Sequence, residues 1–208
     1  YPAAGVYRDE RINRIFEGTN EINRLIISGT CLKKAILEEL PIRDVLFEMR
    51  NGVSHSNNFD NLIEQESEVV EYSKGLCLRV LDDLINIYGQ DFKNKQWLIE
   101  PFANIVSSIF IMHNCFLRYF QLEEGNHKNL TLPVMKLSIC QQYQKVLMNV
   151  KLINSHICEK MEFENEDEKY NFCNVLDSSK LNYLPNEIAL KKNIADELYR
   201  NEKYYLNT

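Results

Sequence analysis

The sequence predicts an all-α fold built as a helical bundle, and three observations support this prediction. Apolar residues recur at intervals of three and four along most of the 208 residues, which is the spacing of one face of an α-helix. Alternation of apolar and polar residues, typical of a half-buried strand, persists nowhere. The hydrophobic fraction is 45%, an ordinary value for a globular chain, so the helices have enough apolar surface to form a core.

The predicted helices follow one another along the chain. A first amphipathic helix carries an apolar stripe from Ile22 to Ala35, and Pro41 ends it or begins the next helix. The turn-forming residues 51–58 then mark a linker. Further helices are expected over residues 62–88 (closed by Gly89), 97–119, 137–153, 169–176 and 186–200, with an acidic break at 162–168.

Charge and cysteine spacing narrow the functional class. The net charge is −6 with both signs interspersed, which disfavours a nucleic-acid partner. No Cys-x-x-Cys pair occurs, so we expect neither a metal site nor a disulfide framework. The apolar stretch 102–120 contains several polar residues, which favours a buried bundle helix over a membrane span. We expect reduced, buried thiols at Cys31, Cys77, Cys115, Cys140, Cys158 and Cys173.

Residues 15–24, with the sequence IFEGTNEINR, are the strongest candidate for a functional site. A side chain that acts as a general base needs a pKa near the working pH, and burial of a carboxylate raises its pKa towards that value. Ile15 and Phe16 precede Glu17, so we expect an apolar surround for this carboxylate. Gly18 allows either close approach of the backbone to a substrate or a backbone conformation that other residues avoid, and Thr19 suits the N-cap of the following helix. On spacing alone, the alternative of a solvated glutamate at a loop-to-helix junction stays open.

Together with Tyr1-Pro2 and Arg8-Asp9, this run resembles the signature near the end of the catalytic region of flavin-dependent acyl-CoA dehydrogenases. The resemblance covers residues 1–35, and Gly5 and Phe16 depart from a more usual helix former and a frequent tyrosine.

The resemblance implies a role for five residues. Glu17 would be the catalytic base that takes the alpha proton of an acyl-CoA substrate, and Gly18 would contact that substrate. Thr19, Asn20 and Glu21 would contact FAD, which receives the beta hydrogen as a hydride. The product would be a trans-2-enoyl-CoA, and the reaction would be a step of fatty acid β-oxidation. The electrons would pass to an electron-transfer flavoprotein.

The resemblance also implies a domain organisation. Residues 1–40 would be the end of the catalytic helical domain, residues 41–57 a linker with a short helix, and residues 58–208 an additional antiparallel helical bundle. A tail of this length resembles the long-tailed, very-long-chain branch of the family. As a C-terminal fragment, the chain by itself is expected to be colourless and inactive.

The remaining expectations concern partners and alternatives. We expect a homo-oligomer with an intracellular location, cytoplasmic in a bacterium and at the mitochondrial matrix or inner-membrane face in a eukaryote. No signal region opens the sequence, so targeting information would lie upstream or not exist. Residues 32–49 could contact a membrane surface. The main competing hypothesis is a non-catalytic helical oligomerisation or docking module with a remnant signature, and a third is a relative acting on other acyl-CoA-like or nitro substrates.

Overall fold

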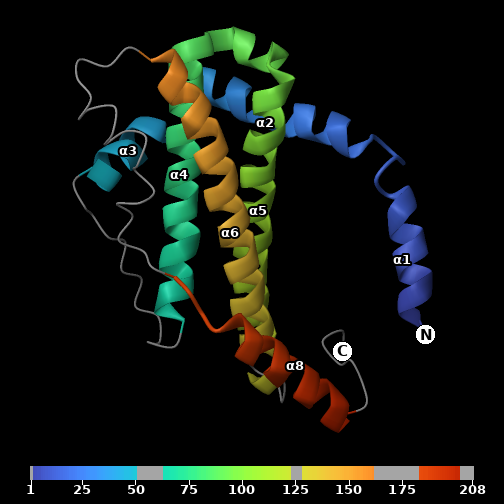
Figure 1. Cartoon of the computed structure of the whole chain (residues 1–208). Coiled ribbons are helices and arrows are strands. Elements are labelled where there is room, and N and C mark those ends of the chain that lie inside the picture. The colour runs from blue at the N-terminus through green and yellow to red at the C-terminus, as the bar shows by residue number, and fades with distance from the viewer. Residues whose placement is uncertain (1, 51–62, 123–127, 162–182, 202–208) are drawn as a thin grey trace.

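The computed structural model describes residues 2–50, 63–122, 128–161 and 183–201 (Figure 1). Within these ranges the chain forms seven α-helices and one 3-10 helix and no strand, which confirms the all-α prediction. In chain order the elements are α1 (Pro2–Ile12), α2 (Asn20–Ile36), α3 (Ile42–Arg50), α4 (Glu64–Tyr88), η1 (Gly89–Asn94), α5 (Gln96–Leu122), α6 (Lys128–Lys160) and α8 (Glu187–Asn201).

Three long helices, α4, α5 and α6, run side by side and form the body of the molecule (Figure 1). Each is antiparallel to the one before it, and η1 joins α4 to α5 at one end. Gly89 caps α4 with a φ of 53°, a left-handed conformation that glycine adopts without steric cost. The predicted end of this helix at Gly89 is therefore confirmed.

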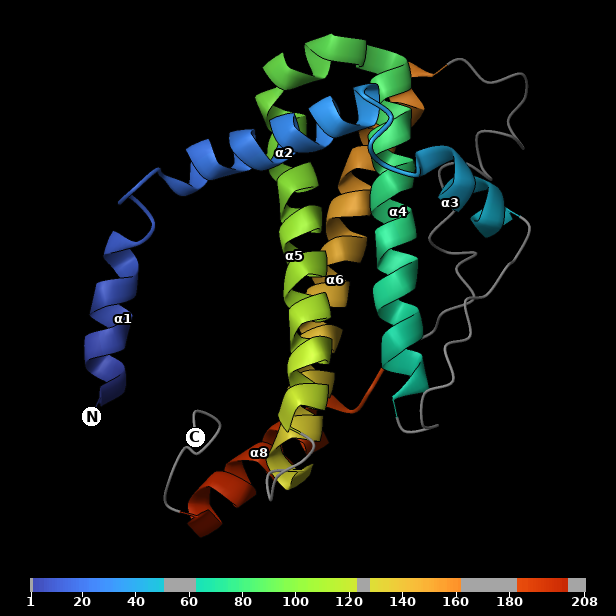
Figure 2. The ribbon, with the colours of Figure 1, turned by 180° about the vertical axis from the view of Figure 1, so that it is seen from behind.

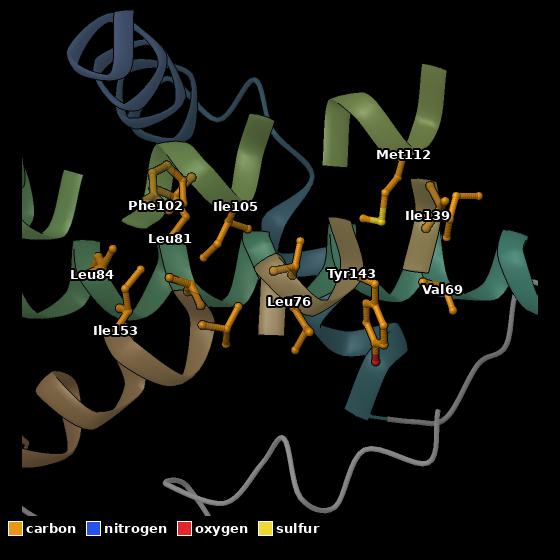
Figure 3. Packing of buried hydrophobic residues seen from close by; sticks show 14 of the residues in the cluster. Val69, Leu76, Leu81, Leu84, Phe102, Ile105, Met112, Ile139, Tyr143 and Ile153 are labelled. Atoms are coloured by element: carbon orange, nitrogen blue, oxygen red, sulfur yellow. The ribbon is translucent and has the colours of Figure 1, made fainter. Parts of the chain in front are cut away.

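The hydrophobic core fills the space between these three helices (Figure 3). Leu84 of α4, Phe102 and Ile105 of α5, and Ile139 and Ile153 of α6 are all completely buried. Burial of one such side chain contributes about 1.5–3 kcal/mol to the free energy of unfolding. Residues 102–120, predicted to form a buried bundle helix, therefore lie in α5, and part of this stretch faces the core.

None of the helices in the described ranges combines the length and apolar content that a membrane crossing requires.

Helix α6 begins nine residues earlier than predicted and continues through Pro133. The predicted start follows the apolar stripe, whose first residue is Leu137. Proline disfavours a helix interior because it lacks the amide hydrogen of a helical hydrogen bond. Leu130 and Met135, on either side of Pro133, are buried in the bundle, and this packing offsets the missing hydrogen bond. The prediction at 186–200 is confirmed by α8, whereas those at 51–58, 162–168 and 169–176 lie outside the described residues.

Helix α2 lies across one end of the bundle and packs on α5 and η1 (Figure 2). Its residue Leu32 belongs to the same hydrophobic core as α4–α6. Ser28 Oγ donates a hydrogen bond of 3.2 Å to the carbonyl oxygen of Ile99, and Arg24 Nε donates one of 3.2 Å to Asn104 Oδ1. The division of the chain into domains at residues 40 and 58 stays a prediction.

The cysteines differ in part from the prediction. Cys31, Cys77, Cys115 and Cys140 are free, as predicted, although only Cys140 is fully buried. Cys158 is disulfide-bonded, so the prediction of a reduced thiol is wrong for this residue. Pairing depends on which sulfur atoms meet in the folded chain, and sequence spacing does not show this. Cys173 lies outside the described residues.

Candidate functional site

The candidate site lies in the turn between α1 and α2. The amides of Ile15 and Phe16 donate to the carbonyl of Ile12, at 3.0 and 2.9 Å, and so carry the chain past the end of α1. The amide of Asn20 then donates to the carbonyl of Arg14 at 3.1 Å, which closes the turn at the start of α2. This hydrogen bonding fixes the path of the backbone through residues 12–20.

Glu17 has a left-handed backbone conformation, with a φ of 53°. A side chain on a left-handed residue crowds its own backbone, at a cost of about 1–3 kcal/mol. Such strain persists where the local structure requires it, and it occurs often in functional sites. No sequence pattern indicated this conformation, because glutamate is not a residue that turns usually select at such a position.

Gly18 also has a positive φ, of 100°. A Cβ atom added here would lie 3.1 Å from Oδ1 of Asn23, whose Nδ2 donates a hydrogen bond of 3.2 Å to the carbonyl of Gly18. A larger residue would therefore disturb both the backbone and this hydrogen bond. The expectation that Gly18 adopts a conformation that other residues avoid agrees with this geometry.

Thr19 is the N-cap of α2, as predicted. Its Oγ1 accepts a hydrogen bond of 3.3 Å from the amide of Ile22. The pKa of Glu21, in the first turn, lies below its usual value because the carboxylate accepts hydrogen bonds from its own backbone amide and from Thr19. Arg24 and Arg14 lower the pKa further, which makes the Glu21 carboxylate a weaker base than an ordinary glutamate.

An open hollow of about 530 Å³ adjoins the turn. Its lining contains Thr19, Asn20 and Glu21, the three predicted FAD contacts, and four arginines. The complete lining is Arg8, Arg11, Ile12, Arg14, Ile15, Thr19, Asn20, Glu21 and Arg24. Guanidinium groups bind phosphate oxygens well, so these donors fit the diphosphate of a dinucleotide such as FAD.

The arginines of the hollow were missed by the sequence analysis, although a signal for them was present. Arg8 and Arg11 are three residues apart, a spacing that puts both side chains on one face of α1, and Arg14 follows at the same interval in the turn. Glu17 and Gly18 do not line the hollow, so the structure groups the predicted FAD contacts but leaves the predicted base beside them.

The expected apolar surround of Glu17 is absent from the described part of the chain. Glu17 is exposed, and so are its neighbours Ile15 and Phe16, at 71% and 64% of their surfaces. The physical reason is visible in Figures 1 and 2, where α1 and the turn stand apart from the bundle. Burial of this carboxylate would require a layer that the described residues do not supply.

Comparisons with known proteins relate the chain to acyl-CoA dehydrogenases. No protein-family model matches the chain. It is 38% identical over 125 residues to a "Probable acyl-CoA dehydrogenase" of Bacillus subtilis (strain 168), a match covering 57% of this chain and 20% of that protein. The chain thus spans only about a fifth of the length of this relative.

The structure also matches a crystal structure of an acyl-CoA dehydrogenase complexed with FAD from Bacillus anthracis. The TM-score is 0.80 at 26% sequence identity, and the match covers 98% of this chain and 35% of that one. The chain therefore shows partial homology to the acyl-CoA dehydrogenase family, and its all-α fold matches one part of an acyl-CoA dehydrogenase structure.

Proposed function

We propose that this chain is the C-terminal part of an FAD-dependent acyl-CoA dehydrogenase in which Glu17 is the catalytic base. The observation that carries the proposal is the strained, left-handed Glu17 beside Gly18, directly before the capped start of α2. This turn is formed by the run that resembles the family signature, in a chain with partial homology to the family. Glu38 has a similar φ outside this run, so the support for a functional role comes from the combination of the strained conformation with the signature run.

In the proposed reaction, the Glu17 carboxylate takes the alpha proton of the thioester substrate. The electron pair of the broken C–H bond forms the carbon–carbon double bond as the beta hydrogen leaves as a hydride. FAD supplies the hydride acceptor when it is bound. Gly18 leaves room for the acyl-CoA, while Thr19, Asn20 and Glu21, with the arginines of the hollow, hold the cofactor. The product is a trans-2-enoyl-CoA.

Several further assignments belong to the same proposal. Electrons would pass to an electron-transfer flavoprotein, and the intracellular enzyme would be a homo-oligomer. Placement in the very-long-chain branch and the membrane contact of residues 32–49 likewise remain proposals. Because Glu17 is exposed in the described residues, the base needs a covering layer from the rest of the parent protein. The 208-residue chain alone should therefore be colourless and inactive.

The test is bleaching of bound flavin in the full-length parent after addition of long-chain acyl-CoA. Glu17→Gln keeps the shape of the side chain but removes the base, so we expect bound flavin and no bleaching. Glu10→Gln, on the exposed surface of α1, is the matched control and should bleach as the parent does. Equal bleaching of the parent and of Glu17→Gln would contradict the role of Glu17 as the base. A parent that binds no flavin would contradict the proposed dehydrogenase activity.

A non-catalytic docking or oligomerisation module is the second candidate, and one observation favours it. Large apolar side chains are exposed along α1, the turn and the first half of α2, and such surface usually marks an interaction site. They are Val6, Tyr7, Ile12, Ile15, Phe16, Ile22 and Ile26. Analytical ultracentrifugation of the 208-residue chain and flavin content of the parent separate the candidates, since only the docking module predicts association together with a flavin-free parent.

A further inference from the structure

The segment that carries α8 lies at the end of the bundle opposite to α2 (Figure 1). Tyr183 is its only buried residue between positions 183 and 200, with 6% of its surface exposed. The other residues of this stretch are partly or fully exposed, including the apolar Leu184, Ile188 and Tyr199. Helix α8 thus contacts α6 without adding a buried side chain of its own to the core.

Tyr183 is held by contacts to two helices of the bundle. Its hydroxyl donates a hydrogen bond of 2.9 Å to Oε1 of Glu66, on α4, from which it is separated by 117 positions in the sequence. Its ring meets the ring of Tyr143, on α6, in an edge-to-face contact with centroids 6.3 Å apart. Four residues further on, Glu187 accepts a hydrogen bond of 3.0 Å from Gln144 Nε2. The segment is therefore fastened at its first few residues.

Only one of the two carboxylate oxygens of Glu66 has a polar partner among the described residues. Its side chain is almost completely buried, and Oε1 receives both the Tyr183 hydroxyl and the ammonium group of Lys136, at 3.3 Å. Its other oxygen, Oε2, is buried without a hydrogen-bond partner among the described residues. A buried carboxylate oxygen without a donor is costly, and water recovers this cost once it reaches the group. Removal of Tyr183 from its place would thus expose a carboxylate that gains from hydration.

We propose that residues 183–201 form a hinged arm, fastened to the bundle by the hydrogen bond from Tyr183 to Glu66, which opens as a unit while α4, α5 and α6 stay folded. The arm has few buried apolar contacts, so its opening requires much less free energy than global unfolding. Opening uncovers a socket formed by Glu66, Lys136 and Tyr143. No step of this proposal uses Glu17, so it stands or falls separately from the proposed dehydrogenase activity.

Native-state hydrogen exchange of the 208-residue chain, followed by mass spectrometry, tests the arm. Tyr183→Phe keeps the ring but removes the donor to the ion-paired carboxylate of Glu66, which should accelerate exchange of the α8 amides about ten- to hundredfold. Exchange of the α5 amides should not change. Tyr199→Phe is the matched control, because this tyrosine lies on the same arm with 82% of its surface exposed, and it should exchange as the wild type does.

Two results would overturn the inference. Equal acceleration in α5 and α8 would make Tyr183 an ordinary core residue whose loss loosens the whole bundle. Unchanged exchange in α8 would show that the hydroxyl does not fasten the arm. Glu66→Gln provides a second variant that keeps an oxygen acceptor but removes its charge, so it should accelerate α8 exchange by less than Tyr183→Phe and leave α5 unchanged.

Discussion

Replacement of Glu17 by asparagine should stabilise the protein while it removes the proposed base. Glu17 has a φ of 53°, a left-handed conformation that asparagine adopts more readily than glutamate. The strain of a left-handed non-glycine residue is about 1–3 kcal/mol, and asparagine should relieve about 0.5–1 kcal/mol of it. In a chain of this size, such a gain raises Tm by about 1–4 °C.

The assay is urea unfolding of the 208-residue chain, followed by circular dichroism at helical wavelengths. Glu38→Asn is the matched control, because Glu38 has nearly the same φ, 56°, and lies outside the candidate site. Its exposed ion pair with Arg43, at 3.5 Å, contributes little, so this variant should also gain stability. A loss of stability in Glu17→Asn beside a gain in Glu38→Asn would refute the argument from strain, because Glu17 would then make a stabilising contact.

One further substitution and one change of pH should each lower the stability of the fold. Gly18→Ala should lower the free energy of unfolding by more than about 1 kcal/mol, since alanine is strained at positive φ and its Cβ would crowd Asn23; an unchanged urea midpoint would contradict this. Burial raises the pKa of Cys77 and of Tyr143 to about 12 each, so stability should be complete below the ordinary pKa values of 9.0 and 10.0 and fall as pH rises towards 12. A urea midpoint that stays constant from pH 8 to pH 11 would be inconsistent with these raised pKa values.

Most helices could be predicted because their apolar periodicity is long and regular. The apolar stripe of α4 and Gly89 at its end predict where this helix lies and where it stops. Thr19 before Glu21 is a recognisable helix start. The start of α6 was misplaced because the apolar stripe that predicted it begins at Leu137, whereas the helix begins at Lys128 and continues through Pro133.

The properties of the site depend on tertiary structure and were less accessible from the sequence. The exposure of Ile15 and Phe16 depends on how far α1 stands from the bundle, a distance that local sequence does not encode. Likewise, the hydrogen bond from Tyr183 to Glu66 joins residues 117 positions apart, and no local pattern pairs them. The left-handed conformation of Glu17 contradicts the usual preference of glutamate, so no local sequence pattern predicted it.

The attachment of α2 makes this helix a cantilever. It is clamped through Arg24, which binds Asn104 and lies 3.6 Å from Glu100, and through Ser28, while its first turn projects beyond the bundle and ends at the Glu17 turn (Figure 2). A helix is stiff over such a length, so the clamp on α5 sets where the turn stands. Asn104, which is 80 positions from Arg24 in the sequence, thereby helps to set the placement of Glu17, and a shift at Asn104 would be carried to the projecting end of α2.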